Sequence, residues 1–209
     1  AEAGGEPRSV GTAPDDPATL AEMLDAGRHD CDLLITTGGA SAGERDVVKR
    51  VLTELGARFI VKQIAMRPGR PFGFALWRDL PVCVLPGNPT AAFVCFQQLV
   101  RPALARMSGV TSVGLPRLYA HLHGELRSRP GRRYFVLARL DLTPDGFVVS
   151  PLENQCSALV RTAADANALI ILPESDLPAG SSSRVLPGAL VEVEVIDWPR
   201  PCHAAPEIV

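Results

Sequence analysis

Two apolar runs in the first half of the sequence each end in a glycine-containing turn that leads directly into a helical pattern. The run "CDLLITT" (31–37) is followed by a glycine-rich loop and then by "VVKRVLTEL". The run "PVCVLPG" (81–87) is followed by Asn88-Pro89, which opens a helical pattern that extends to about Met107. Continuous apolar runs of this length are typical of strands buried on both faces. Their alternation with helices indicates an α/β fold, with a parallel sheet and helices on its faces.

The remainder of the first 110 residues continues this alternation. A helix is predicted over 17–27, because Asp16 is placed to cap it and Pro17 suits its first turn. The segments "PRSVGTA", "RFIVKQIAM" and "FGFALW" are predicted as strands, and the last two flank a turn at 67–71. The helix that follows the glycine-rich loop has a single apolar stripe, which is typical of a helix packed on a sheet.

From about Thr111 the pattern changes to short strands. The predicted strands lie within "RLYAHLHGEL", "RRYFVLARLDL", "GFVVSPLE", "ALIILPE" and "ALVEVEVIDW". Pro144-Asp145-Gly146 is a strong hairpin turn between the second and third of these segments. We therefore predict a small all-β module, either a barrel or a sandwich, followed by a proline-rich tail.

Composition is that of an ordinary globular protein, with 46% apolar and 21% charged residues in a chain of 209. The net charge of −2 gives no argument for nucleic acid or an anionic membrane as a partner. No apolar run is long enough to span a bilayer, and "AEAGGEPRSV" at the start has no signal-peptide pattern. The five cysteines form no C-x-x-C pair, so we expect reduced, buried thiols rather than a zinc site.

Residues 39–43 spell G-x-S-x-G, which is also the nucleophile elbow of serine hydrolases. That chemistry requires an acid and then a histidine downstream of Ser41, and an oxyanion loop upstream of it. The four histidines are poorly placed for this role. His29 precedes the serine, His121 and His123 lie on one strand of the β module, and His203 is in the tail. The hydrolase interpretation therefore lacks its partners.

The loop does not match the phosphate-binding P-loop motif either, because Glu44-Arg45 stands where that motif has Lys-Ser/Thr. The loop still places backbone N–H groups and the Ser41 hydroxyl at the carboxyl edge of the sheet, where doubly wound folds bind ligands. Its glycines let an anion approach the backbone, and the N-terminus of the next helix favours negative charge. We therefore interpret Gly38, Gly39, Ser41 and Gly43 as an anion cradle.

Other residues near this edge have two interpretations each. Asp46 either complements the helix dipole or binds Mg²⁺ beside phosphates. Arg67 and Arg70 sit on a stiff proline-glycine turn, which is either simply solvated or holds an oxyanion. Asn88 caps the next helix, and Gly87 before it would allow close approach to the backbone. The local sequence leaves these alternatives open.

Taken in order, three motifs resemble the MoeA family of molybdopterin molybdenumtransferases, which includes the E domain of gephyrin. They are "TTGGASAGERD", "RPGRP" and "LPGNPTAA", and an all-β module follows them. The family motifs read T-S-G-G-V-S-V-G-x-x-D, K-P-G-K-P and P-G-N-P-V-S-A. The resemblance covers nearly the whole chain.

The resemblance implies an activity, its substrates and the residues that handle them. The family inserts molybdenum from molybdate into adenylylated molybdopterin and releases AMP in a Mg²⁺-dependent step. By carry-over the catalytic residues would be Asp46, Arg67 and Arg70, with Asp46 as the Mg²⁺ ligand. The ligand-binding residues would be Thr37, Gly38, Gly39, Ser41, Gly43, Gly69, Pro86, Gly87, Asn88 and Pro89.

The resemblance also implies an architecture and a cellular context. Residues 1–110 would form a three-layer molybdopterin-binding α/β domain with a parallel or mixed sheet. Residues 111–197 would form a small barrel-like all-β domain, and 198–209 a tail. The family is cytoplasmic and acts on small molecules as a homodimer, with no nucleic acid or membrane partner.

The chain differs from the family pattern at the arginine-containing turn and in where it starts. Arg67 and Arg70 replace lysines, which keeps charge and donors in a chain that is poor in lysine. The chain starts about where the first helix of the α/β domain should end, so we expect the C-terminal half of a longer protein. The competing hypothesis is a molybdopterin-binding scaffold module without turnover.

Overall fold

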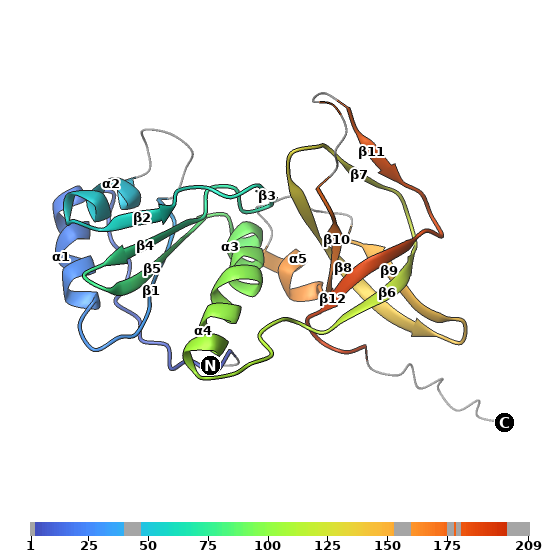
Figure 1. The fold of residues 1–209 in the computed structure, drawn as a ribbon, viewed down its shortest axis with the longest axis horizontal. Helices are drawn as coiled ribbons and strands as arrows, with labels where there is room; N and C mark the ends of the chain where they lie inside the picture. The colour runs from blue at the N-terminus through green and yellow to red at the C-terminus, as the bar shows by residue number, and fades with distance from the viewer. Residues whose placement is uncertain (1–2, 40–46, 153–159, 175–177, 179–180, 200–209) are drawn as a thin grey trace. The chain divides into compact units, whose positions relative to one another are not determined.

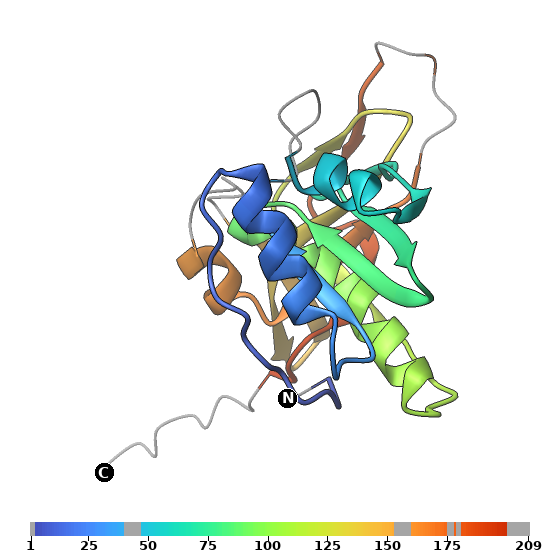
Figure 2. The same ribbon diagram turned by 90° about the vertical axis from the view of Figure 1, so that its left-hand side faces the viewer.

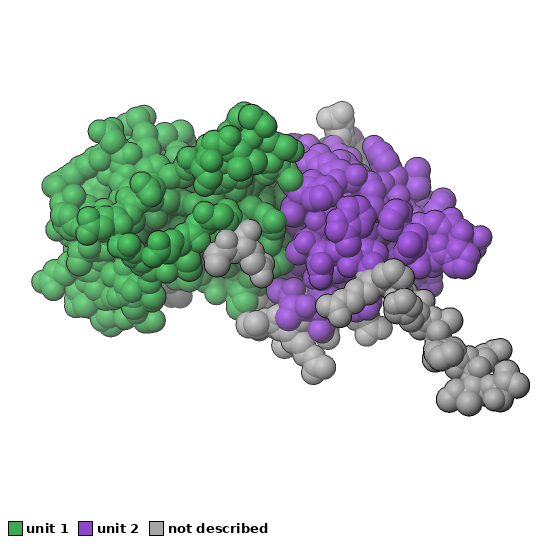
Figure 3. All heavy atoms as spheres, turned by 90° about the horizontal axis from the view of Figure 1, so that it is seen from below, with its two compact units in different colours: residues 1–114 green, residues 115–209 purple. Residues whose placement is uncertain are grey.

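The computed structural model describes residues 3–39, 47–152, 160–174, 178 and 181–199. The chain divides into two compact units, Ala1–Gly114 and Leu115–Val209, which are coloured separately in Figure 3. The first unit combines strands and helices, whereas the second consists mostly of strands (Figure 1). No helix in the part of the chain that is described is long and apolar enough to cross a membrane.

A four-stranded sheet forms the centre of the first unit, with strand order β1-β5-β4-β2 (Figure 1). The strands are β1 (Leu34–Thr37), β2 (Arg58–Val61), β4 (Gly73–Trp77) and β5 (Leu80–Leu85). β1 and β5 run parallel, as their apolar runs predicted. β4, however, runs antiparallel to both β5 and β2. The sheet is therefore mixed, one of the two forms that the resemblance implied, whereas the all-parallel sheet indicated by the alternation of segments was wrong.

The antiparallel course of β4 follows from the two-residue turn Arg78-Asp79 between Trp77 and Leu80, which pair across the turn. Both turn residues have positive φ, 50° and 68°, as in a type I′ hairpin turn. A connection this short can join only antiparallel neighbours. Arg-Asp lacks the Asn-Gly signal of such turns, so the sequence did not predict this hairpin.

The helices α1 (Pro17–Gly27) and α2 (Val47–Glu54) pack against each other and against one face of the sheet (Figure 2). The predicted cap is present, because an Asp16 carboxylate oxygen accepts a hydrogen bond from the Thr19 N–H at 2.8 Å. The apolar core of this layer contains Leu24, Leu34, Val48, Val51, Leu52, Ala57, Ala75, Trp77, Val82 and Val84. The apolar stripe predicted for α2 is therefore its buried side.

A long helical segment follows β5, as the sequence predicted. It consists of α3 (Pro89–Cys95), a π-helical turn (Phe96–Val100) and α4 (Arg101–Met107). The π-helical turn includes Gln98, four residues before Pro102. In a regular α-helix residue 102 would donate to the Gln98 carbonyl, but proline has no N–H to donate. α3 packs beside β5, and its buried residues are not part of the α1–α2 core. The helices thus form layers on both faces of the sheet.

One strand predicted near the N-terminus is absent. Residues 7–13 of "PRSVGTA" form no ladder in the structure and are almost all exposed. The Ser9 hydroxyl oxygen instead accepts a hydrogen bond from the Gly11 N–H at 3.3 Å. Such a side-chain-to-backbone bond offers the chain a local turn in place of a strand ladder.

The second unit is a small closed β-barrel of five strands with the order β10-β12-β6-β9-β8, in which β10 also pairs with β8. The strands are β6 (Arg117–Leu122), β8 (Arg133–Thr143), β9 (Gly146–Pro151), β10 (Ala168–Leu172) and β12 (Leu190–Val195). The predicted turn joins β8 and β9 as an antiparallel hairpin with Thr143 opposite Gly146. The short helix α5 (Val160–Asp165) and the ribbon of β7 (Leu126–Ser128) and β11 (Ser183–Val185) complete the unit. The sequence analysis predicted neither α5 nor β11.

Asn167 joins three segments of the barrel just before β10. Its side chain accepts from the Leu140 N–H at 2.7 Å and donates to the Leu140 carbonyl at 2.9 Å. Its backbone carbonyl accepts hydrogen bonds from Ile196 and Asp197. The side-chain amide therefore takes the place of a strand partner for Leu140, which is fully buried.

We expect Asn167→Ala to destabilise the barrel by about 2–3 kcal/mol, because it leaves two buried backbone groups of Leu140 without partners. Chemical denaturation measures this change in the free energy of unfolding. Arg139→Ala on the same strand is the matched control, because the Arg139–Asp141 pair is solvent-exposed. It should cost less than about 1 kcal/mol. Equal losses for the two variants would contradict the proposed role of Asn167.

Candidate ligand-binding site

The two parallel strands of the first unit end side by side. Thr37 and Leu85 are paired at the ends of β1 and β5, and both strands continue into glycine-containing loops. The Thr37 hydroxyl donates to the Pro86 carbonyl at 3.2 Å, which ties the loops together. A Cβ atom added to Gly87 would lie 3.0 Å from the Gly38 Cα. The predicted juxtaposition of Gly38 and Gly87 at one edge of the sheet is therefore confirmed.

The two glycines after β1, Gly38 and Gly39, differ in what surrounds them. Gly39 has a φ of 64°, and a Cβ there would lie 2.6 Å from Val48 Cγ2 in the first turn of α2. Gly38 has a φ of 93°, and a Cβ there would meet no described atom within 4 Å. The backbone thus packs against the helix at one residue and is open at the other. An open backbone beside the start of a helix is suited to an anionic ligand.

The arginine-containing turn reaches the same edge of the sheet. Gly73 at the start of β4 pairs with Val84 in β5, which pairs in turn with Thr36 in β1. The turn at 67–71 follows β3 (Met66–Arg67) and immediately precedes this row of residues. The order of strands therefore brings the turn to the end of the sheet where β1 and β5 stop.

The turn itself is held against α3. Gly69 has a φ of 115°, and a Cβ there would lie 2.6 Å from Cys95 Sγ. The Gly69 carbonyl accepts from the Phe72 N–H at 2.9 Å. Arg67 and Arg70 are both exposed on this anchored turn. Two exposed guanidinium groups on a fixed backbone are suited to an oxyanion.

Asn88 and Pro89 begin α3 in the way the sequence predicted. The Asn88 side-chain oxygen accepts a hydrogen bond from the Ala91 N–H at 3.2 Å, and Pro89 occupies the first turn. The capping role of Asn88 is therefore confirmed. A role in ligand binding for either residue, or for Pro86, stays a prediction from the sequence.

Among the residues that the structure describes, two buried hydroxyl oxygens beside this edge have no hydrogen-bond partner: Oγ1 of Thr36 and Oγ1 of Thr90. Thr36 is in β1, two residues before Gly38, and Thr90 is in the first turn of α3 and only 3% exposed. Buried polar groups are normally paired, so unpaired ones require an explanation. Their position beside the converging loops suggests that this edge is built for a polar partner.

We expect Thr90→Val to stabilise the first unit by about 1 kcal/mol, because it removes an unpaired buried hydroxyl with little change of shape. If the hydroxyl serves a ligand, the same variant should also weaken binding of molybdopterin, the ligand that the resemblance implies, several-fold. Thermal denaturation and ligand titration measure the two effects. Higher stability with unchanged affinity would show that Thr90 has no part in binding.

Three residues that the sequence analysis placed in the cradle or beside it lie outside the described residues. They are Ser41, Gly43 and Asp46. Among the residues that are described, no group of three His, Cys, Asp or Glu side chains could hold a metal ion. The assignment of Asp46 to Mg²⁺ and of Ser41 to a phosphate therefore stays a prediction from the sequence.

The thiols and imidazoles of the described residues do not form a nucleophilic centre. Burial raises the pKa of Cys83 to about 11 and that of Cys95 to about 12, so both thiols stay protonated at neutral pH. Both are free and buried, as expected, whereas Cys31 is only partly buried. His121 and His123 both belong to the second unit, where they lie near the Gly188 carbonyl and the Ser150 hydroxyl.

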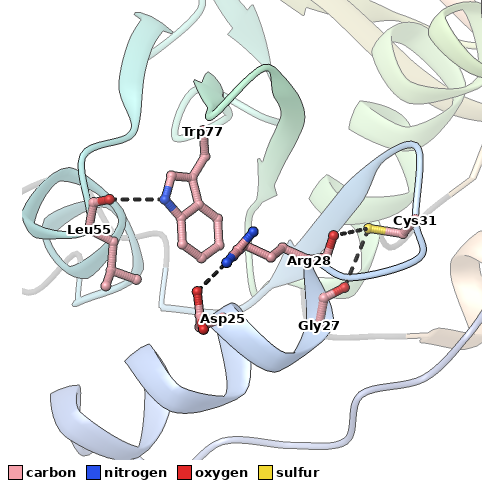
Figure 4. A network of polar contacts seen from close by, with 6 residues as sticks. All are labelled: Asp25, Gly27, Arg28, Cys31, Leu55 and Trp77. Atoms are coloured by element: carbon pink, nitrogen blue, oxygen red, sulfur yellow. Dashed lines mark hydrogen bonds and ion pairs between the residues drawn. The ribbon is translucent and has the colours of Figure 1, made fainter.

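The opposite end of the sheet lies at the turn between β4 and β5. A hollow of about 420 Å³ there is lined by Arg28, Cys31, Asp32, Trp77, Arg78, Asp79, Leu80 and Pro81. Figure 4 shows that Arg28 lies between the Asp25 carboxylate and the Trp77 ring. Cys31 donates its thiol hydrogen towards backbone carbonyls in the same region (Figure 4). Arg28 and Cys31 thus have partners within the fold, so we regard their part of this end as structural.

We expect Gly87→Ala to weaken binding of molybdopterin, the ligand that the resemblance implies, by at least about 10-fold. The added methyl would lie 3.0 Å from a backbone atom of Gly38, which cannot rotate away as a side chain would. The loops would have to separate, and a displacement of about 1 Å in a binding site has large effects. Gly114→Ala, where a Cβ meets nothing described within 4 Å, is the control. Equal affinity of both variants would contradict a close-packed loop pair.

The geometry agrees with comparisons to known proteins. A family model described as "Probable molybdopterin binding domain" matches residues 1–106 of the chain. The chain therefore belongs to the family of molybdopterin-binding domains. A second model, "MoeA C-terminal region (domain IV)", matches residues 119–196. The two models match the two units in turn along the chain, and the resemblance recognised from the three motifs is confirmed.

Individual relatives give the same result. "Molybdopterin molybdenumtransferase 2" of Mycobacterium tuberculosis is 35% identical over 193 residues, which are 88% of this chain and 47% of that protein. "Molybdopterin molybdenumtransferase" of Nostoc is 30% identical over 188 residues, 88% of this chain and 43% of that protein. A crystal structure of the MoeA protein from Pyrococcus horikoshii has a TM-score of 0.74 and 28% identity, covering 90% of this chain and 43% of that one. The chain thus spans about half the length of these relatives.

Proposed function

We propose that this chain is the molybdopterin-binding and C-terminal region of a molybdopterin molybdenumtransferase. Adenylylated molybdopterin and molybdate are its substrates, and AMP is released as molybdenum is transferred to the pterin dithiolene. The observation that carries the proposal is the close approach of Gly38 to Gly87. Two loops without side chains at one sheet edge leave room for a phosphate-bearing ligand beside the start of a helix.

In this proposal the residues of the edge divide into two roles. Arg67 and Arg70 hold molybdate or phosphate through charge and through the several donors of each guanidinium. The cradle and the pocket wall bind the pterin phosphate or its adenylyl group. They comprise Thr37, Gly38, Gly39, Ser41, Gly43, Gly69, Pro86, Gly87, Asn88 and Pro89. Arginine in place of the lysines of the family motif retains the positive charge of the turn.

Mg²⁺ belongs to the proposal through Asp46. The ion is held by few protein carboxylates and by substrate phosphates, and it keeps several waters. A single carboxylate near the cradle is therefore compatible with it, although the described residues contain no cluster that would hold the ion alone. When bound, the ion supplies positive charge beside the phosphates. The residues of the chain position the pterin and the oxyanions.

The remaining assignments complete the proposal. Residues 1–110 act as the molybdopterin-binding domain, 111–197 as the C-terminal domain and 198–209 as a tail. The whole protein works as a cytoplasmic homodimer, as implied by the resemblance. The serine-hydrolase interpretation of Ser41 is not proposed, because the histidines of the chain are poorly placed to activate a nucleophile there.

The test is AMP release by the full-length protein that contains this sequence. With adenylylated molybdopterin, molybdate and Mg²⁺, we expect AMP in proportion to enzyme and dependent on both additions. The 209-residue chain alone should bind molybdopterin but release little AMP. Binding without AMP release by the full-length protein would favour the competing hypothesis of a binding module. Failure of both proteins to bind molybdopterin would overturn the proposal.

A further inference from the structure

Lys49 connects three segments around the candidate site. It is in the first turn of α2, which follows the glycine-rich loop. Its ammonium group donates to the Lys62 carbonyl at 2.9 Å and to the Pro71 carbonyl at 2.7 Å. Lys62 follows the end of β2, and Pro71 ends the arginine-containing turn. One side chain therefore links the start of α2 to the turn that carries Arg67 and Arg70.

The stem of Lys49 has a defined path. A Cβ atom added to Gly73 would lie 2.8 Å from Lys49 Cε and 3.2 Å from a ring carbon of Phe59. The stem thus passes over the first residue of β4, where only a glycine leaves room for it. Gly73 is paired with Val84 in β5, one residue before the strand ends. The ammonium group therefore reaches its acceptors at the same edge of the sheet as the converging loops.

The two hydrogen bonds fix the position of the Lys49 ammonium group more closely than is usual for a surface lysine. A lysine on a helix surface usually keeps its charged end in water. Here the ammonium donates to two backbone carbonyls from separate segments, and hydrogen bonds of a charged donor are about twice as strong as neutral ones. The chain has only two lysines among 21 basic residues, and the other is Lys62 itself. Lys62 participates through its backbone carbonyl.

We propose that Lys49 is a positioning residue for anion binding, which holds the 67–71 turn at a fixed distance from the start of α2. The inference rests on the proposed function, in which the turn and the glycine cradle bind parts of the same substrates. Lys49 acts through Arg67 and Arg70, because its ammonium is directed to backbone carbonyls. Loss of the link would let the turn move away from the cradle and would lower affinity more than the rate of the bound complex.

The test compares Lys49→Met with Lys62→Met in the full-length protein. Both variants remove one positive charge, but only the first removes the two hydrogen bonds. We expect Lys49→Met to raise the KM for molybdate about 10-fold with a change in kcat of less than about two-fold, while Lys62→Met stays near wild type. Lys49→Arg, which keeps charged donors, should recover most of the affinity. If the two methionine variants changed the KM for molybdate equally, Lys49 would contribute only through its net charge. That result would overturn the inference.

A second measurement does not depend on turnover. Amide hydrogen exchange of Phe72, whose N–H is bonded to Gly69 within the turn, should become faster in Lys49→Met and stay unchanged in Lys62→Met. Unchanged exchange in Lys49→Met would overturn the positioning role whatever the activity. If wild-type protein shows no AMP release while exchange changes as expected, the proposed function fails and the structural link stands. Lys49→Gln carries the same expectations should Lys49→Met fail to fold.

Discussion

Asp46→Asn in the full-length protein is expected to bind molybdopterin nearly as well as wild type and to release AMP far more slowly. The substitution preserves shape and removes one negative charge. If that charge holds Mg²⁺ beside the substrate phosphates, its loss should lower the rate of AMP release by at least the roughly 10- to 100-fold that is typical of losing an outer partner of a metal ligand. The measurement is AMP formed per enzyme at several Mg²⁺ concentrations, together with a titration of ligand affinity.

Asp79→Asn provides the control for this experiment. It removes the same charge from the turn between β4 and β5, at the opposite end of the sheet. Asp79 has a φ of 68°, which asparagine adopts readily, so the fold should be unaffected. Turnover of this variant should stay within about two-fold of wild type, as is usual for a surface change away from a site. An Asp46→Asn protein with wild-type turnover and Mg²⁺ dependence would leave Asp46 as a helix-dipole residue only.

The part of the fold that could be predicted from sequence is the part in which local pattern and tertiary structure agree. The apolar runs of β1 and β5 predicted two parallel strands, and their glycine-containing ends predicted loops at one edge. Asp16 and Asn88 predicted helix starts through capping chemistry that needs only neighbouring residues. The proximity of Gly38 and Gly87 then followed, because parallel strands end at the same edge.

The errors arose where a tertiary or backbone requirement overrides the local signal. The turn Arg78-Asp79 adopts positive φ without glycine or asparagine, so nothing in its residue types signalled a hairpin. The ribbon strand β11 is only three residues long and depends on its pairing with β7. The segment 7–13 had strand-like residues but forms no ladder. Pairing is a property of two segments, and single-segment patterns do not contain it.

The candidate site shows the same division. The cradle glycines, the arginine turn and the start of α3 were recognised because each has a short motif. Lys49, in contrast, gave no signal beyond its place in a helix, since its acceptors are 13 and 22 residues further along the chain. The unpaired hydroxyls of Thr36 and Thr90 were likewise invisible in the sequence, because burial decides whether a hydroxyl lacks water.

Trp77 at the far end of β4 supports the largest stability prediction. Its side chain is 1% exposed, and its indole N–H donates to the Leu55 carbonyl at 2.9 Å. The Arg28 guanidinium carbon lies 5.6 Å from the ring centroid (Figure 4). Trp77 thus joins β4 to the end of α2 and to the end of α1, and it is among the largest fully buried side chains of the described residues.

Trp77→Ala is expected to destabilise the first unit by about 3–5 kcal/mol, the usual cost of removing a buried aromatic side chain. This is a large part of the roughly 5–15 kcal/mol by which a domain is stable, so the variant should be partly unfolded near 37 °C. Trp77→Phe keeps most of the apolar contact and leaves the Leu55 carbonyl without its donor, so it should cost about 1–3 kcal/mol. Chemical denaturation followed by circular dichroism measures both values.

Trp198→Ala is the matched control, because Trp198 is the only other tryptophan of the chain and is 55% exposed. Its ring lies 6.4 Å from that of Phe147 in the second unit, a contact worth about 0.5–1.5 kcal/mol beyond the burial of surface. The loss for Trp198→Ala should therefore be well below that for Trp77→Ala. A larger loss at Trp198 than at Trp77 would mean that the α1–α2 layer is held by contacts other than the indole.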